Sequence, residues 1–250
     1  MISIYKTPSF KKIVKTTLID LPSPSNIFTL WNFGFLLGIC LILQIVRGLF
    51  LAIHYSCDIR IDFNSVSHIS RDINFGWALR LVQTNVLIFF ILCFYTHIDR
   101  GIYYGSYNFE LVWINKVKIL LLIIATAFLG YVLPWGQIST WGATVITNLF
   151  SDISYLGAEI VYWLWGGFVA DNATLTRFFN SHFLLPFIIL GGSMIHLVLF
   201  HTTSSRDPLE LNRNVGKSSF HPYFSYKDFL GIRIILFFYG YNLSSTPNMG

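Results

Sequence analysis

Two apolar segments decide how this chain folds, RLVQTNVLIFFILCFYTHIDRG at 80–101 and SHFLLPFIILGGSMIHLVLFH at 181–201. The spans that we expect here, at about 77–98 and 178–200, are each long enough to cross the hydrocarbon core of a bilayer as a helix, which takes about 20 mostly apolar residues. Each also carries two polar side chains fourteen residues apart. They are Gln83 and His97 in the first segment, and His182 and His196 in the second.

Helix geometry places the two polar side chains of each segment on one face. Fourteen residues make four turns less about 40° and advance about 21 Å, so one side chain lies towards each side of the membrane. Ionisable groups inside a membrane usually face a bundle interior or a functional site. Imidazole is a common axial ligand of haem iron. Spacing alone leaves a second interpretation open, in which each histidine only hydrogen-bonds to a neighbouring helix.

The composition predicts an all-α membrane protein. Of 250 residues, 54% are hydrophobic and only 12% are charged, whereas soluble domains carry roughly 25% charged residues. Two further stretches, 31–54 and 114–133, are also long and apolar enough to span a bilayer. A fifth stretch at 229–241 is too short to span comfortably. The net charge of +5 is modest, and we expect no nucleic-acid partner.

Three regions follow from this pattern. Residues 1–30 form a basic segment that we expect at the lipid headgroups or against a partner, residues 31–204 the transmembrane helix bundle, and residues 205–250 a loop with a truncated fifth helix. The aromatic, glycine-rich stretch between 134 and 167 suits either interfacial helices or a long loop. The cysteines Cys40, Cys57 and Cys93 show no metal-binding spacing, so we expect inert core thiols.

Alternating crossings arrange the polar side chains at two levels. If the four segments alternate in direction, 80–101 and 181–201 run parallel. His97 is then level with His196 (the His97 level), and Gln83 is level with His182 (the His182 level). Two haems stacked across a membrane would need such a frame. Glycines that permit close approach of a flat ring, or equally of another helix, support it; they are Gly34, Gly48 and Gly130.

Several longer motifs resemble mitochondrial cytochrome b, the membrane core of the ubiquinol–cytochrome c reductase complex. The resemblance covers about residues 25–232 and is to the N-terminal portion of cytochrome b, a bundle of four haem-binding helices. The motifs are WNFGFLLGICLILQI at 31–45, GLFLAIHY at 48–55, RGIYYGS at 100–106, TAFLGYVLPWGQISTWGATVITNL at 126–149, WGGFVADNATLTRFFNSHFLLPF at 165–187 and FHPYFSYKD at 220–228.

The resemblance implies a redox function in the mitochondrial inner membrane. It implies two haems b, ubiquinol and ubiquinone sites on opposite faces, and electron transfer coupled to proton translocation. Implied partners are membrane lipid, an iron–sulfur protein and cytochrome c1 within a dimeric complex. The complex would be a quinol–cytochrome c oxidoreductase, and the resemblance leaves open whether this chain acts as an enzyme alone.

The resemblance also assigns residues. The iron ligands would be His97 and His196 for the high-potential haem, and His182 for the low-potential haem. Arg80 and Arg100 would bind haem propionates, and we expect Gln44 to contact a cofactor beside Gly34, Gly48 and Gly130. The quinol-oxidation pocket would include Phe128, Tyr131, Gly142 and Ile146. The quinone-reduction pocket would include Asn32, His201, Ser205, Lys227 and Asp228, with His201 and Asp228 suited to supply protons.

Three features depart from the family pattern. Gln83 stands where the family has histidine, and an amide oxygen is a poor iron ligand beside imidazole nitrogen. We therefore expect a low-potential haem that is five-coordinate, weakly bound or absent. Arg47 lies inside a membrane segment, where an arginine costs about 2.5–3.5 kcal/mol unless it is paired. No PEWY motif occurs, so we expect half of the quinol-oxidation pocket to be missing unless another chain supplies it.

Two alternatives therefore remain beside an electron-carrying cytochrome b. One is a partial or degenerate copy that keeps only the high-potential haem. The other is a structural membrane subunit that binds no haem. The three histidines, the two arginines and the glycines speak against the structural subunit.

Overall fold

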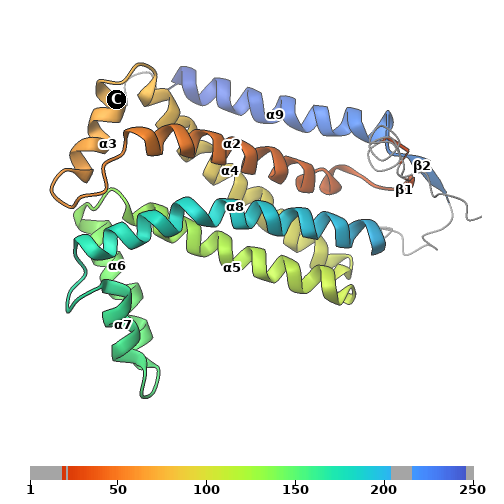
Figure 1. Cartoon of the computed structure of the whole chain (residues 1–250). Coiled ribbons are helices and arrows are strands. Elements are labelled where there is room, and N and C mark those ends of the chain that lie inside the picture. The colour runs from red at the N-terminus through yellow and green to blue at the C-terminus, as the bar shows by residue number, and fades with distance from the viewer. Residues whose placement is uncertain (1–18, 21, 204–215, 246–250) are drawn as a thin grey trace, which may run out of the picture.

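Four long helices form the body of the molecule in the computed structural model, which describes residues 19–20, 22–203 and 216–245 (Figure 1). They are α2 (Phe33–His54), α4 (Gly76–Tyr103), α5 (Glu110–Val132) and α8 (Asn172–Thr203). All four are long and apolar enough to cross a membrane. The four predicted spans are confirmed, and α4 and α8 extend beyond the predicted limits.

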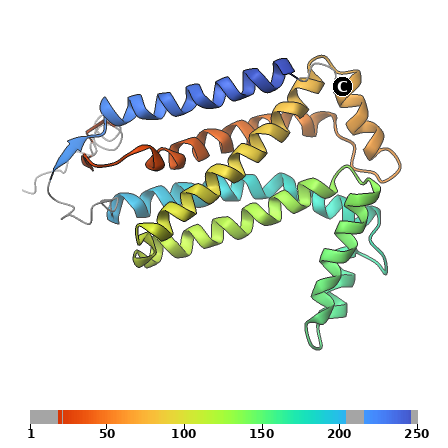
Figure 2. The same cartoon turned by 180° about the vertical axis from the view of Figure 1, so that it is seen from behind.

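The helices pack as two antiparallel pairs, α2 with α4 and α5 with α8 (Figures 1 and 2). At one end of the first pair, Gly34 lies against the ring of His97. Further along, Gln44 Nε2 donates a hydrogen bond to the backbone oxygen of Gln83. Because the residue numbers run in opposite directions along this interface, α2 and α4 are antiparallel.

The second pair is held in the same manner. Gly130 of α5 lies against His182 near the start of α8. Asn115, near the start of α5, donates from Nδ2 to the backbone oxygen of Gly192 at 3.1 Å. Successive long helices reverse direction, so α4 and α8 run parallel, as the alternation predicts.

An apolar layer fills the middle of the bundle. Val86 and Phe90 belong to it and lie on α4 between Gln83 and His97, so the layer separates the two polar levels. Cys40 and Cys93 are fully buried in the same layer as free thiols, as predicted for core cysteines, whereas Cys57 is half-buried after α2 and lies outside this core. The buried members are Leu36, Cys40, Leu41, Val86, Phe90, Cys93, Phe94, Ile119, Ile123 and Ile189.

The outer faces of the long helices are apolar and exposed. Ile88 on α4 and Val198 on α8, for example, are 63% and 64% exposed. In water such continuous apolar surface would be unfavourable, whereas lipid tails are as apolar as these side chains. The distribution therefore suits helices that face lipid or other membrane subunits.

Short helices connect α5 to α8 beyond one end of the bundle. They are α6 (Gln137–Asn148), η4 (Leu149–Asp152) and α7 (Gly157–Trp165), and they project away from the long helices (Figures 1 and 2). Of the two interpretations of this stretch, the helical one is confirmed. Gly166 ends α7 at a φ of +77°, a conformation that favours glycine, and Arg177 of α8 donates to the backbone oxygen of Trp163.

The remaining elements lie at the two ends of the bundle. A short helix, α3 (Asp62–Arg71), joins α2 to α4, and the 3₁₀ turns η2 (Thr29–Trp31) and η3 (Ser106–Asn108) flank the long helices. The strands β1 (Pro22–Pro24) and β2 (Lys217–Ser219) pair antiparallel at the other end. This pairing brings the chain beyond α8 back beside the start of α2.

A fifth long helix, α9 (Tyr223–Ser245), follows β2 and packs along α2. A Cβ on Gly231 would lie 3.1 Å from Leu36 Cδ2, so the two helices approach closely there. The expected length of this element, 229–241, is wrong, because the helix has 23 residues. Hydropathy counted only its apolar part, whereas the polar YFSYKD segment continues the same backbone hydrogen bonding.

Candidate functional site

The structure brings His97 and His196 together inside the bundle. Their ring centres are 6.3 Å apart and the rings are inclined by 74°. An imidazole nitrogen binds a first-row metal ion at about 2 Å, so two imidazoles on opposite sides of one ion have ring centres about 6 Å apart. The His97 level therefore has the spacing of two axial ligands.

The protein offers few other metal ligands. Within the described ranges, no group of three or more His, Cys, Asp and Glu side chains could hold a metal ion. A metal ion bound by only two protein ligands needs its remaining ligands from a cofactor, and a porphyrin supplies four nitrogens in a plane. Gly34 suits such a ring, since a Cβ there would already lie 3.4 Å from His97 Cε1.

Positive charge surrounds the His97 level. Arg100 Nη2 lies 3.5 Å from His97 Nδ1, and the guanidinium carbon lies 4.9 Å from the ring centre of Trp31. Lys116 of α5 is also buried, and both cations lie within electrostatic range of the two imidazoles. Arg100 was expected here and Lys116 was not. Its signal was a lysine inside a membrane span, in WINKVKIL.

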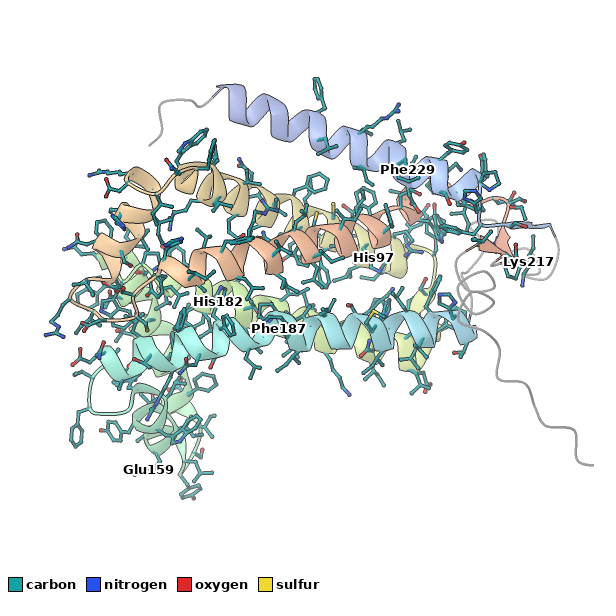
Figure 3. All side chains as sticks on the ribbon, turned by 45° about the horizontal axis from the view of Figure 1, so that its top comes forward. His97, Glu159, His182, Phe187, Lys217 and Phe229 are labelled. Atoms are coloured by element: carbon teal, nitrogen blue, oxygen red, sulfur yellow. The ribbon has the colours of Figure 1, made fainter. Side chains whose placement is uncertain are left out.

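The His182 level is built around a glycine. His182 Nδ1 lies 2.9 Å from the backbone oxygen of Thr126. A carbonyl oxygen only accepts, so Nδ1 carries the proton and Nε2 keeps the lone pair that a metal ion needs. A Cβ on Gly130 would lie 2.5 Å from His182 Cε1, so no other residue at 130 leaves this ring its place. Figure 3 shows His182 and His97 at different depths of the bundle.

The opposite side of the His182 level lacks a second imidazole. Gln83 lies fourteen residues before His97, and His182 lies fourteen residues before His196. Because α4 and α8 run parallel, Gln83 and His182 are at one level. Gln44 Nε2 is 3.0 Å from the Gln83 backbone oxygen. Among the described residues, the Oε1 atoms of both glutamines are buried without a hydrogen-bond partner. Two amide oxygens do not fit a bis-imidazole haem.

Two other expected residues, Arg80 and Gly48, and the unexpected Arg47 lie on the same two helices as Gln83 and Gln44. Arg80, one turn before Gln83, is half-buried. Gly48 has no atom within 4 Å of the position of a Cβ, so space is open beside α2. Arg47 is buried in the same helix, and its Nε donates to the backbone oxygen of Leu43 at 3.0 Å.

The residues expected to bind quinol gather where α5 meets α6. A Cβ on Gly142 would lie 4.0 Å from Tyr131 Cε1. Tyr131 and Ile146 are 56% and 45% exposed, so both border an open face. Phe128 instead belongs to the packing beneath that face, because its ring lies 5.9 Å from that of Phe178.

The residues expected to bind quinone lie at the opposite end of the bundle, where α8 ends and α2 and α9 begin (Figure 1). Lys227 Nζ donates to the backbone oxygen of Ile27 at 2.9 Å. Asp228 is buried, and burial raises its pKa to about 6. His201 is exposed and, within the described part of the chain, makes no hydrogen bond to Asp228. Asn32 directly precedes α2, and Ser205 lies outside the described residues.

Comparison with known proteins identifies the family to which this fold belongs. Residues 18–204 match the family model described as cytochrome b/b6/petB. A solved structure titled hyperthermophilic respiratory Complex III superposes with a TM-score of 0.85 and 32% sequence identity. The alignment covers 93% of this chain but 64% of the matched chain, so this chain spans less than two thirds of its relative. With its membrane-length helices and facing histidines, the chain is a multi-pass membrane protein and belongs to the cytochrome b/b6 family.

Proposed function

We propose that this chain transfers electrons across a membrane as the haem-binding part of a quinol-linked respiratory complex. The observation that carries the proposal is the pair His97 and His196, with ring centres 6.3 Å apart inside a membrane-length bundle. Haem b, when bound, supplies reversible one-electron redox chemistry. Family membership and the match to a respiratory Complex III structure support the same function.

At the His97 level the protein residues hold and orient the cofactor. His97 and His196 would bind the iron from α4 and α8, while Gly34 leaves room beside α2. Arg100 would bind a propionate, since its guanidinium is buried one turn from His97. The apolar layer next to this level keeps water away from the cofactor.

At the His182 level the donor set favours weaker binding. Thr126 fixes the tautomer of His182 so that Nε2 would be free to bind a haem iron, and Gly130 provides space for the ring. Gln83 cannot replace an imidazole. We infer that haem at this level is held by His182 alone, or is absent. This observation favours a second candidate function, a partial cytochrome b that carries electrons only at the His97 level.

A non-redox structural subunit has less support. Such a subunit would place the half-buried His97 and His196 and two buried cations in the bundle without a ligand that uses them. Polar and charged groups are costly inside a membrane unless they are paired or functional.

Quinone sites are proposed at the two ends of the bundle. Tyr131, Gly142 and Ile146 form an open apolar face at one end. At the other end, Asn32 precedes α2 and Lys227 adjoins Asp228 in α9, and the raised pKa of Asp228 would let it exchange a proton near neutral pH. We also propose that another chain completes these sites. The complex would include an iron–sulfur protein and cytochrome c1 and would lie in a mitochondrial inner membrane.

Haem quantitation on the purified chain tests the proposal. We expect a reduced-minus-oxidised spectrum of a bis-imidazole haem b, lost in His97→Ala and His196→Ala. His68→Ala is the matched control, because His68 lies on the surface and pairs with Asp72. If the wild-type chain, isolated in its native membranes, contains no haem, the proposed function is wrong.

A further inference from the structure

Two buried cations from different helices meet beside the His97 level. Arg100 on α4 and Lys116 on α5 are only 8% and 9% exposed. Lys116 Nζ lies 3.2 Å from the position of a Cβ on Gly101, the neighbour of Arg100. Aromatic rings cover both: Trp31 lies 4.9 Å from Arg100 Cζ, and Trp113 lies 5.6 Å from Lys116 Nζ.

No carboxylate of the described residues balances this charge. Neither cation takes part in the ion pairs of the described chain, and Arg100 Nε is buried there without a hydrogen-bond partner. The acids closest in sequence, Asp99 and Glu110, are exposed. Two like charges in a low-dielectric interior repel each other and lose hydration, and contacts with aromatic faces replace only part of that hydration. The pair is therefore suited to an anion.

The direction of the Lys116 side chain also indicates an anion-binding role. It lies six residues after Glu110, the first residue of α5, so its long side chain could reach the membrane surface. Lys118, two residues later, is exposed in that way. Lys116 is instead directed into the bundle, towards Gly101 and the two imidazoles.

We propose that Arg100 and Lys116 together bind the two carboxylates of the haem held by His97 and His196, with Lys116 as the second cation. This inference rests on the proposed haem at the His97 level. Haem b carries two propionate groups on one edge, so two cations match its charge. A lysine suits this task because its ammonium is a compact charge on a flexible stem. A phospholipid phosphate would offer similar anionic chemistry from another source.

Equilibrium redox titration of the full haem-loaded chain tests the role of Lys116. The component to follow is the one that His196→Ala abolishes. A cation near a haem disfavours the more positive ferric form, so Lys116→Gln should lower the midpoint potential of this component and speed the release of its haem. Lys116→Arg should restore much of both. Lys118→Gln removes an equal charge from the exposed side of α5 and should change neither property.

The outcomes separate this inference from the proposed function. A wild-type chain without haem at the His97 level overturns both. If haem is present and a folded Lys116→Gln chain keeps the wild-type midpoint potential and haem release rate, only the role of Lys116 is overturned. If that variant instead loses co-purified phosphorus while its potential is unchanged, a phospholipid occupies the cation pair and the haem-carboxylate assignment is wrong.

Discussion

The imidazole of His182 occupies the space that a side chain on Gly130 would need. A Cβ on that glycine would lie 2.5 Å from His182 Cε1 and 3.1 Å from both ring nitrogens. The backbone oxygen of Thr126, one turn earlier on α5, accepts from the same ring. One segment of α5 thus fixes both the position and the tautomer of His182.

Gly130→Ala should displace the His182 ring and remove any haem bound at the His182 level. Alanine is favoured over glycine in a helix by about 1 kcal/mol, so a loss would arise from the clash and not from the backbone. Haem content per chain and the visible spectrum measure the effect. Gly191→Ala is the control, because that glycine is on α8 with no atom near its Cβ position. If the wild-type chain carries haem at the His182 level, equal haem content in both variants would contradict the prediction.

Gln83→His should convert the His182 level into a bis-imidazole site. The second imidazole would raise the haem content from one per chain towards two, or turn a five-coordinate haem into a six-coordinate one. In the wild type, a reduced five-coordinate haem would bind carbon monoxide, and Gln83→His should abolish that difference spectrum.

Gln83→Ala provides the matched control for this substitution. Because an amide oxygen contributes little as an iron ligand, its haem content should equal that of the wild type. Two bis-imidazole haems in the wild-type chain would show that Gln83 does not leave the His182 level short of a ligand.

The fold was largely predictable because hydropathy and helix periodicity act locally. Apolar runs of membrane length defined four helices, and the spacing of Gln83, His97, His182 and His196 placed the polar levels. The extent of α9 was not predictable from hydropathy, since its first turns are polar. Lys116 was missed because sequence separates it from Arg100, while the packing of α5 brings the two cations near the same imidazoles.

For the residues expected to bind quinol, the sequence did not predict which side chains face outwards. The family resemblance grouped Phe128 with Tyr131, but the two differ in environment, since Phe128 packs inside and Tyr131 faces outwards. Residues three apart on a helix share only part of one face. Which of them borders an open surface depends on where α6 packs, and a linear pattern does not contain that information.

Thiol labelling tests the packing of the bundle core. Cys40 and Cys93 are fully buried between the helices, whereas Cys57 is half-buried in the segment after α2. A maleimide should therefore label one cysteine per chain slowly in the folded protein, since burial also raises the pKa of the Cys57 thiol and reduces its thiolate fraction. Cys57→Ser should show no native labelling but two labels after unfolding. Native labelling of that variant would contradict the tight α2–α4 packing.

Asp228 should titrate near neutral pH. Burial raises its pKa from 3.8 to about 6, so the side chain is ionised at pH 8 and protonated at pH 5. The carboxyl stretch in infrared difference spectra should appear as the pH falls through about 6 and be absent from Asp228→Asn. Because the folded-state pKa is raised, ionisation opposes folding, and wild-type stability should fall as the pH rises from about 4 to above 6. Asp228→Asn should lose the part of this dependence that Asp228 contributes, although Asp62, whose pKa burial also raises, should keep its own part. Asp99→Asn, which removes an exposed carboxyl, should keep both the band and the dependence. A band that appears only below about pH 4 would show that Asp228 is hydrated and unsuited to exchange protons with a quinone.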